Sequence, residues 1–435
     1  MKYYSTNHRA PEVSLAEAVK KGLAPDKGLY MPERIGRLPE EFFGNIADMD
    51  FHGIATAVAE KFFGEDIPSE DLKKIVCDTL NFDTPIVNVH DRIWSLEPFH
   101  GPTLAFKDVG GRFMARMLSY FIAQEGGTGK VTVLVATSGD TGSAVANGFL
   151  GVDGIDVIVL YPEGKVSEIQ EKQFTTLGKN ITALEVAGNF DDCQRLVKSA
   201  FMDQDLNRML TLTSANSINV ARFLPQAFYY FNAYAQLKRA GKADNVVFCV
   251  PSGNFGNITA GLIAWRMGLP VKRFIAANNR NDVFLEYLRT GIYSPRASVR
   301  TIANAMDVGD PSNFARVMDL YGSSVEAVRK DIGGCRYTDD EIRDTIATVY
   351  GKYGYLLDPH GACGYQGLAD NLGDDENGIF LETAHPAKFK DTVEDIIHKD
   401  VDIPQRLRDF MAGEKKSIRI SSDFDDFRQY LESRN

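Results

Sequence analysis

A single lysine follows a short apolar stretch in residues 101–110, which read GPTLAFKDVG. Lys107 comes directly after Leu104, Ala105 and Phe106, and an apolar side chain then recurs every four residues. This spacing predicts a helix that begins at or near Lys107. An amine in apolar surroundings loses part of its preference for the charged form and becomes a nucleophile toward carbonyl carbons. A surface lysine that snorkels past apolar neighbours would have the same local sequence, so other motifs must separate the two readings.

A glycine-rich loop, PSGNFGN at 251–257, joins an apolar strand to a predicted helix. Gly253 and Gly256 leave room for close approach and permit the conformations that an anion nest needs. Exposed N–H groups at the start of a helix hold phosphate well. No lysine of the Walker type is present, which argues against a nucleoside triphosphate. A turn without any ligand is the alternative reading of this loop.

A second loop, TSGDTG at 137–142, has the same strand–loop–helix setting. The hydroxyls of Ser138 and Thr141, together with the N–H groups of Gly139 and Gly142, suit a carboxylate or a phosphate. Asp140 would repel an anion, so we expect its side chain to face a donor elsewhere. The alternative reading is a helix cap.

Polar residues also follow two other predicted strands. The stretch 216–223 combines small polar side chains with one guanidinium, which is a good anion site: Asn216, Ser217, Asn219 and Arg222. The stretch 381–389, LETAHPAKF, places Thr383 and His385 where parallel α/β folds put ligand contacts. Capping and solvated side chains would explain either stretch alone. GGTGK at 126–130 lacks the first glycine and the final hydroxyl of a P-loop and is expected to be a turn.

From about residue 93 the chain alternates between strands and helices, which predicts parallel sheets with right-handed crossovers. The expected strands are apolar runs at 131–136, 155–161, 181–187, 209–215, 246–250, 271–277 and 378–383, the last of which ends the pattern. A helix is expected over 339–353, and the region 290–330 shows no clear pattern. Residues 1–92 look mostly helical, with helices near 51–63 and 69–80 capped by Asp50 and Ser69.

Composition narrows the functional class. The net charge of −11 argues against nonspecific nucleic-acid binding and against an anionic membrane surface. The five cysteines form no CxxC pair and the histidines form no ligand cluster, so we expect reduced thiols and no metal. The N-terminus has no apolar run, and no stretch of about 18 apolar residues exists, so a cytoplasmic protein is expected.

Taken together and in this order, the motifs resemble those of the threonine synthase family. They are GPTLAFKD, TSGDTG, NSIN followed by Arg222, PSGNFGN and LETAHPAKF, and the N-terminal YYSTNHRAPEVSLAEAVKKGLAPDKGLYMP and the later NAMDVGDPSNFARV are similar to the longer branch of that family. The resemblance implies pyridoxal-phosphate fold type II, an α/β fold of two parallel-sheet, three-layer α/β domains with the cofactor between them and a mostly helical N-terminal domain. The implied domains are 1–92, 93–235 with the lysine and the carboxylate loop, and 236–435 with the phosphate loop.

The resemblance also assigns roles to residues. Lys107 would form the Schiff base with pyridoxal 5'-phosphate, and Thr383 would bind its pyridine nitrogen. The cofactor phosphate would be held by Gly253, Asn254, Phe255, Gly256 and Asn257. The substrate carboxylate would be held by Ser138, Gly139, Thr141 and Gly142, and the substrate phosphate by Asn216, Ser217 and Arg222. Related enzymes often have Asn at the position of Asp140, in contact with the cofactor 3′ oxygen, so Asp140 is counted with the cofactor ligands.

The reaction implied is the last step of threonine biosynthesis, in which O-phospho-L-homoserine and water give L-threonine and phosphate. Two alternatives remain open. Serine/threonine dehydratases share the fold but need no second anion site, so Arg222 and Ser217 separate them from this reading. A catalytically silent binding protein with this fold is the other, and retention of Lys107 between two intact glycine loops argues against it.

Overall fold

The structure, a computed structural model, describes residues 1–126 and 130–434. The GGTGK turn lies largely outside these ranges. The chain forms two compact units, each built from separated stretches. Unit 1 consists of Met1, Met31–Phe106 and Phe223–Asp402, and unit 2 consists of Lys2–Tyr30, Lys107–Arg222 and Ile403–Asn435. These units differ from the consecutive ranges 1–92, 93–235 and 236–435, so that functional division stays a prediction.

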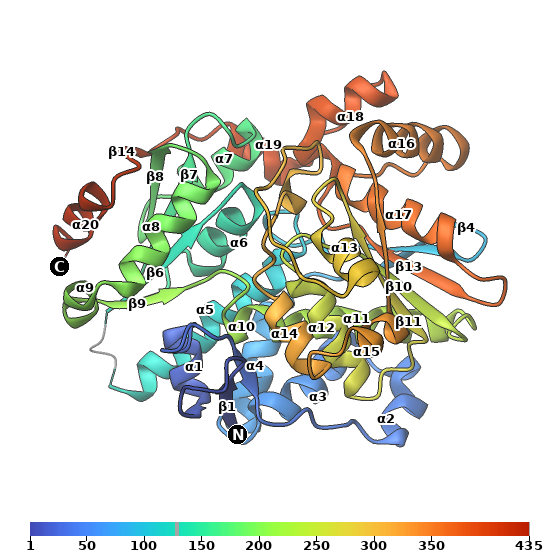
Figure 1. Cartoon of the computed structure of the whole chain (residues 1–435), viewed down its shortest axis with the longest axis horizontal. Helices are drawn as coiled ribbons and strands as arrows, with labels where there is room; N and C mark the ends of the chain where they lie inside the picture. The colour runs from blue at the N-terminus through green and yellow to red at the C-terminus, as the bar shows by residue number, and fades with distance from the viewer. Residues whose placement is uncertain (127–129, 435) are drawn as a thin grey trace. The chain divides into compact units, whose positions relative to one another are not determined.

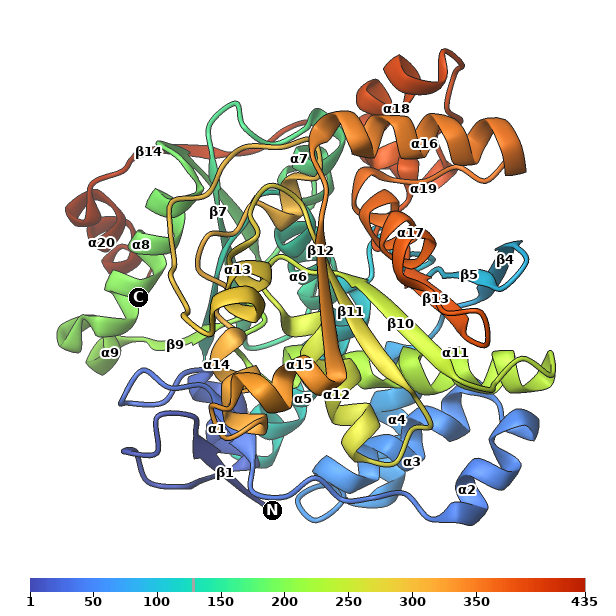
Figure 2. The same ribbon diagram turned by 45° about the vertical axis from the view of Figure 1, so that its right-hand side comes forward.

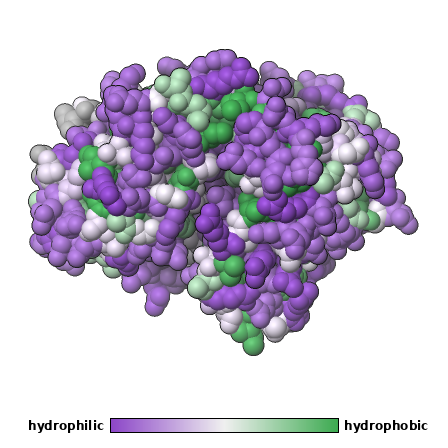
Figure 3. Space-filling model, turned by 90° about the horizontal axis from the view of Figure 1, so that it is seen from above, coloured by the Kyte–Doolittle hydropathy of each residue, from purple (hydrophilic) through white to green (hydrophobic). Residues whose placement is uncertain are grey.

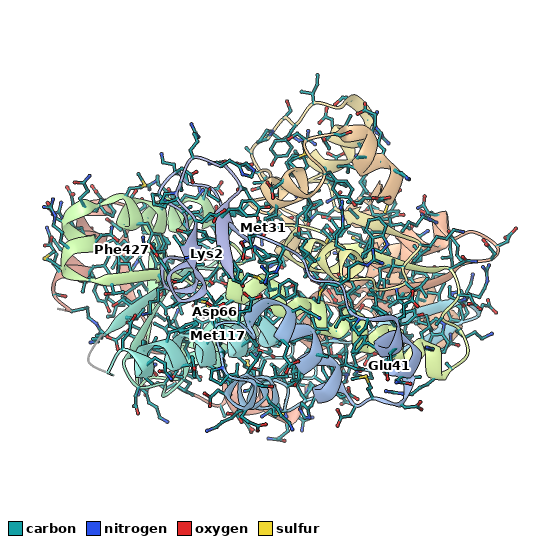
Figure 4. All side chains as sticks on the ribbon, turned by 90° about the horizontal axis from the view of Figure 1, so that it is seen from below. Lys2, Met31, Glu41, Asp66, Met117 and Phe427 are labelled. Atoms are coloured by element: carbon teal, nitrogen blue, oxygen red, sulfur yellow. The ribbon has the colours of Figure 1, made fainter. Side chains whose placement is uncertain are left out.

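Unit 2 contains a parallel five-stranded sheet in the order β14-β8-β7-β6-β9. Its strands are β6 (Val131–Ala136), β7 (Ile155–Pro162), β8 (Ile181–Ala187), β9 (Thr211–Ser214) and β14 (Ile418–Ser421). Every residue of β6 is buried, as the continuous apolar run VTVLVA predicts for a strand covered on both faces. The core of this unit packs Leu134 and Ile158 of the sheet against Leu196 and Phe427, and Phe427 is labelled in Figure 4.

Helices separate the successive strands of the unit 2 sheet along the chain (Figure 1). The helices of this unit are α1 (Leu15–Lys21), α5 (Lys107–Gln124), α6 (Asp140–Phe149), α7 (Glu168–Thr175), α8 (Phe190–Met202), α9 (Gln204–Met209), α19 (Gln405–Met411) and α20 (Phe424–Glu432), while α10 (Val220–Phe223) ends at the boundary of the unit. The short strands β1 (Lys2–Ser5) and β2 (Val13–Ser14) pair antiparallel.

Unit 1 contains a six-stranded sheet in the order β12-β11-β10-β13-β5-β4, whose members are labelled in Figure 2. Its strands are β4 (Ile86–His90), β5 (Ile93–Leu96), β10 (Val246–Pro251), β11 (Arg273–Asn278), β12 (Ile332–Arg336) and β13 (Asn377–Leu381). All neighbours are parallel except β4 and β5, which are antiparallel. Residues of β10, β11 and β13 form one core with apolar side chains of the helices α16 (Asp339–Tyr353) and α17 (Pro359–Asn371).

The remaining elements belong mostly to unit 1 and include four short 3-10 helices. They are β3 (Tyr30–Pro32), α2 (Glu40–Asn45), η1 (Ile46–Asp48), α3 (Phe51–Phe63), α4 (Ser69–Thr79), η2 (Leu224–Gln226), α11 (Ala227–Arg239), α12 (Gly256–Arg266), α13 (Val283–Thr290), η3 (Asn304–Met306), α14 (Phe314–Leu320), α15 (Val325–Asp331), α16 (Asp339–Tyr353), α17 (Pro359–Asn371), α18 (Lys390–Ile397) and the 3-10 helix η4 (Pro386–Phe389).

The predicted α/β fold class is confirmed, and α5 begins at Lys107 as expected. Asp50 caps α3 through its side chain, but the prediction for Ser69 is wrong, because Ser69 is the first residue of α4 and Pro68 precedes it. The strand near 378–383 is not the last one, since β14 follows it. The ambiguous region 290–330 contains η3, α14 and most of α15.

Hydrophilic residues cover most of the face shown in Figure 3. In the described ranges, no helix is both long and apolar enough to cross a membrane. All five cysteines are free thiols. Within the same ranges, no group of three or more histidine, cysteine, aspartate or glutamate side chains is arranged to hold a metal ion.

Candidate active site

The segment before Lys107 is tied to the segment that carries Thr383. In unit 1, Phe106 N donates to Thr383 O at 2.9 Å, and His385 N donates to Leu104 O at 3.0 Å. These two bonds form an isolated antiparallel bridge between Ala105 and Ala384. Leu104 is buried with φ at +57°, a left-handed conformation that bends the chain here. Two predicted site segments that lie far apart in the sequence are therefore joined through their backbones.

Lys107 opens α5, and Arg222 of the same unit lies against that helix start. Arg222 Nη1 donates to Lys107 O at 3.3 Å. A Cβ on Gly111 would lie 2.9 Å from Arg222 Nη1, so glycine is required for this approach. Burial lowers the pKa of the Arg222 guanidinium to about 10, and the nearby Asp108 carboxylate opposes that change. Arg222 stays charged at neutral pH and is 4% exposed.

The 137–142 loop uses part of its backbone for its own structure. Gly139 N and Gly142 N both donate to Thr137 Oγ1, at 2.9 and 2.8 Å. The expectation that these two N–H groups face an anion therefore does not fit the structure. The hydroxyls of Ser138 and Thr141 are half-buried and make no hydrogen bond within the described residues, so they are free to bind a ligand.

Asp140 is the first residue of α6, and its carboxylate faces a donor, as the sequence suggested. Gln170 Nε2 donates to Asp140 Oδ1 at 2.9 Å, and Ser167 Oγ donates to Gln170 Oε1 at 3.0 Å. The Gln170 side chain fills the place that a Cβ on Gly139 would occupy, at 2.6 Å. Sequence reasoning missed Gln170, because nothing in a charged helix start marks one buried glutamine.

The stretch after β9 lies beside the end of β6 in unit 2. Asn216 Nδ2 donates to Ala136 O at 3.1 Å, which places Asn216 next to the 137–142 loop. Asn219 has a structural role instead, because its fully buried Nδ2 donates to Val19 O at 2.8 Å. Ser217 follows Asn216 and is half-buried.

The 251–257 loop of unit 1 ends in an uncapped helix. Phe255, not a glycine, takes the left-handed conformation, with φ at +62°, so the expectation that glycine supplies the special backbone conformation of this loop is wrong. Gly253 is needed for close approach, since a Cβ there would lie 2.8 Å from Ala305 O. Phe255 gives α12 no side-chain cap, which leaves its first N–H groups for an anion.

The side-chain oxygen of Asn257 is held by hydrogen bonds, whereas its side-chain nitrogen has no partner among the described residues. Its Oδ1 accepts hydrogen bonds from Tyr229 Oη and Tyr230 Oη, both at 2.8 Å. Its buried Nδ2 has no hydrogen-bond partner among the described residues. A buried amide N–H₂ without a partner costs free energy, so a ligand acceptor at this loop would offset that cost. Sequence reasoning missed the two tyrosines that orient it.

Thr383 and His385 differ in what their side chains do. His385 Nδ1 accepts from Ala387 N at 3.1 Å and so caps η4, and burial lowers the His385 pKa to about 4, which keeps the ring neutral. The Thr383 hydroxyl makes no hydrogen bond within the described residues, while its carbonyl holds Phe106. Thr383 is therefore the better candidate ligand of the two.

Profiles of three protein families match this chain. The family described as "Pyridoxal-phosphate dependent enzyme" matches residues 79–381. "Threonine synthase N terminus" matches residues 2–80, and "Threonine synthase, C-terminal" matches residues 361–431.

Full-length relatives and solved structures agree with these matches. The threonine synthase of Haemophilus influenzae is 44% identical over 431 residues, which cover 99% of each chain. The crystal structure of threonine synthase from Escherichia coli has a TM-score of 0.94 and 42% identity and covers 100% of both chains. The structure of pyridoxal-phosphate-bound threonine synthase from Brucella melitensis has a TM-score of 0.93 and 37% identity, and covers 100% of this chain and 99% of that one.

Proposed function

The chain belongs to the threonine synthase family of pyridoxal-phosphate-dependent enzymes, and on that premise we propose that the residues described above convert O-phospho-L-homoserine and water to L-threonine and phosphate. The full-length identity to threonine synthases carries this proposal, with Lys107 and both glycine loops in place. The residue roles that follow are proposals.

The loop 253–257 fits the phosphate of pyridoxal 5'-phosphate. The uncapped start of α12 and the buried Nδ2 of Asn257 offer donors to one anion, and Gly253 lets the loop pack closely on the backbone of Ala305. When bound, the cofactor supplies an electron sink for negative charge at the substrate Cα. The hydroxyl of Thr383 would bind the pyridine nitrogen, and Asp140 is proposed to face the cofactor 3′ oxygen.

Lys107 has the central proton-transfer role in this proposal. Its amine would hold the cofactor aldehyde, and when it is not so engaged it would move protons at the substrate Cα and Cβ. The bridge between 104–106 and 383–385 in unit 1 would fix the backbone just ahead of this lysine. Arg222, which holds the Lys107 carbonyl, would keep the start of α5 in place.

Two anionic groups of the substrate are assigned to unit 2. The hydroxyls of Ser138 and Thr141, with the remaining N–H groups of the 137–142 loop, would bind the carboxylate. Arg222, Asn216 and Ser217 would bind the γ-phosphate, because a guanidinium can contact two phosphate oxygens at once. This second site distinguishes the reaction from a dehydratase, whose substrate has no phosphate.

Phosphate release from O-phospho-L-homoserine tests the function. We expect the purified holoenzyme to release phosphate and form threonine in equal amounts, and to act poorly on free serine and threonine. Preference for serine or threonine would favour a dehydratase. A yellow protein that turns over neither would favour a silent binding protein.

A further inference from the structure

The loop 253–257 of unit 1 packs against a second backbone segment of the same unit. We call residues 301–313 the floor segment. A Cβ on Gly253 would lie 2.8 Å from both Ala305 O and Met306 Cα, so loop and floor touch backbone to backbone. Ser312 N donates to Asn254 Oδ1 at 2.6 Å, and Asn313 Nδ2 donates to Asn254 O at 3.0 Å. The position of the loop therefore depends on the position of the floor segment.

The floor segment is anchored to the sheet by a buried asparagine. Asn279 follows β11 and is fully buried. Its Nδ2 donates to Thr301 Oγ1 and to Asp307 Oδ1, both at 2.8 Å. Thr301 N also donates to Asp307 Oδ2 at 3.0 Å, which closes the segment into a loop. Asn279 therefore holds the residues on either side of the stretch 302–306. Within that stretch it contacts only the carbonyl of Ala303.

A histidine near the start of α17 supplies a second anchor. Ala305 N donates to His360 Nε2 at 3.1 Å. A nitrogen that accepts carries no proton, so the ring proton sits on Nδ1, which is hydrogen-bonded to Asp358 Oδ1. Asp358 also caps α17, since His360 N donates to its Oδ1 at 2.7 Å. His360 is 2% exposed and packs on Phe389, so the ring is fixed on every side that the structure describes.

We propose that His360 is a positioning residue of the phosphate-binding loop, which acts through the N–H of Ala305 on Gly253. It touches neither cofactor nor substrate in this role. The inference rests on the proposed function, because it requires that the loop 253–257 holds the cofactor phosphate. A histidine that only filled space in the core would leave the preference for a phosphorylated ligand unchanged.

Two ligands separate positioning of this loop from general stability. Pyridoxal 5'-phosphate and pyridoxal share the ring and the aldehyde, and only the first has a phosphate for the loop. The ratio of their dissociation constants for the apoenzyme, obtained from visible absorbance, reports on the phosphate site alone.

Two substitutions test the two hydrogen bonds of the His360 ring separately. In His360→Gln the side-chain oxygen reaches the position of Nε2 and can still accept from Ala305, whereas His360→Asn keeps only the position of Nδ1, facing Asp358. Leu368→Ala is the matched control, because Leu368 is a fully buried residue of the same helix, about two turns beyond His360, that packs against Gly378 and makes no hydrogen bond through its side chain.

We expect His360→Asn to lose phosphate preference by on the order of 10-fold, with pyridoxal affinity near that of the wild type. His360→Gln should keep most of the preference for the phosphorylated ligand. Leu368→Ala should lower thermal stability without changing that preference. Amide hydrogen exchange should rise at Ala305 in His360→Asn and not in the control.

Equal losses for both ligands in His360→Asn, or an unchanged ratio with faster exchange at Ala305, would overturn the inference. The ratio of the two dissociation constants is measured first for the wild type. If it showed no preference for the phosphorylated ligand, the assignment of the loop 253–257 would itself be wrong, which is a failure of the proposed function and takes the inference with it. If His360→Asn did not fold, the ratio of the two dissociation constants would be measured for His360→Gln and Asp358→Asn instead. An unchanged ratio in both variants would count against the role.

Discussion

At the scale of single residues, the candidate site contains polar groups that have no hydrogen-bond partner in the described part of the chain, next to groups that hydrogen bonds hold in place. Asn257 shows the contrast within one side chain, because two tyrosine hydroxyls hold its oxygen while its buried nitrogen has no partner in the described part of the chain. The hydroxyl of Thr383 makes no bond there, whereas the neighbouring His385 caps η4 through its Nδ1. Unused donors that fixed neighbours orient are the mark of a binding site.

Substitution of Lys107 should remove both cofactor attachment and catalysis. We expect Lys107→Ala to lose the visible absorbance of the lysine-bound cofactor and all measurable phosphate release, since no other amine stands at the start of α5. Borohydride reduction of the holoenzyme followed by peptide mapping should label Lys107. Lys165→Ala, at an exposed position before α7, is the control and should retain both properties. A label on Lys130 or Lys165 would contradict the assignment.

Substitution of Arg222 should weaken recognition of the substrate phosphate. Loss of a charge-assisted contact costs about 1.5–3 kcal/mol, which is roughly 10- to 150-fold in affinity. We expect kcat/KM for O-phospho-L-homoserine to fall by that factor in Arg222→Ala and to recover only partly in Arg222→Lys, whose ammonium lacks the planar fork.

Because Arg222 also holds the Lys107 carbonyl, a second ligand is needed to interpret that result. Homoserine, which has no phosphate, should inhibit the wild type and Arg222→Lys with similar affinity. If affinity for homoserine fell as much as affinity for the phosphorylated substrate, Arg222 would serve the lysine and not the phosphate.

Substitution of Thr383 should have a moderate effect on the cofactor. A hydroxyl orients the pyridine nitrogen without protonating it, so Thr383→Val should weaken cofactor affinity by about 1 kcal/mol, roughly fivefold, and Thr383→Ser should restore it. Equilibrium titration of the apoenzyme measures both. His385→Ala should instead lower stability, because it removes the cap of η4. Cofactor loss in His385→Ala with a normal Thr383→Val would reverse the two roles.

At the scale of elements, the two glycine loops reach similar geometry by different means. In the 137–142 loop Gly139 has φ at +142°, and Thr137 gathers two of the loop's N–H groups. In the 251–257 loop Phe255 makes the left-handed turn, and Gly253 is required by contact with the floor segment. Gly253 is needed for space, whereas Gly139 is needed for both space and backbone conformation.

A methyl group at Gly253 tests this view of the second loop. Gly253→Ala places Cβ against backbone atoms that cannot rotate away, and such overpacking costs about 1–3 kcal/mol. We expect affinity for pyridoxal 5'-phosphate to fall by roughly 5- to 150-fold, as measured by titration of the apoenzyme. Gly351→Ala on α16 is the control, because no atom lies within 4 Å of its added Cβ. Unchanged affinity in Gly253→Ala would show that the loop moves freely.

At the scale of the whole molecule, each unit has its own sheet and its own buried core, and the chain passes between the units more than once. The lysine segment shows the consequence, since Phe106 belongs to unit 1 and Lys107 to unit 2. Stability of either unit therefore bears on residues of the candidate site.

Acid stability should depend on Glu376, which joins strands of the unit 1 sheet. Its carboxylate accepts from Arg273 Nη2 at 2.6 Å and from Gly373 N at 2.8 Å, and chiefly the Arg273 bond lowers its pKa to about 2. A depressed pKa stabilises the folded state above the unfolded value near 4.5, and that contribution disappears as pH falls toward 2.

We therefore expect Glu376→Gln to lower the free energy of unfolding by about 2 kcal/mol at pH 7 and by progressively less below pH 4. Urea unfolding at several pH values measures the difference. Glu17→Gln, which breaks an exposed pair with Lys21, should change stability by less than about 0.5 kcal/mol. A difference for Glu376→Gln that grew on acidification would refute this account.

The sequence by itself determined the α/β fold class, the positions of the strands β6 to β11 and β13, the helix start at Lys107 and the set of motifs that the family shares. These are local properties, because the spacing of apolar residues and the placement of glycine act over a few neighbours. Tertiary structure decided what holds those motifs. Gln170 on Asp140, Tyr229 and Tyr230 on Asn257, and His360 on Ala305 each join positions at least 27 residues apart. A single polar side chain that meets a distant partner has no periodicity, so only the packed chain shows which of the many polar residues has one.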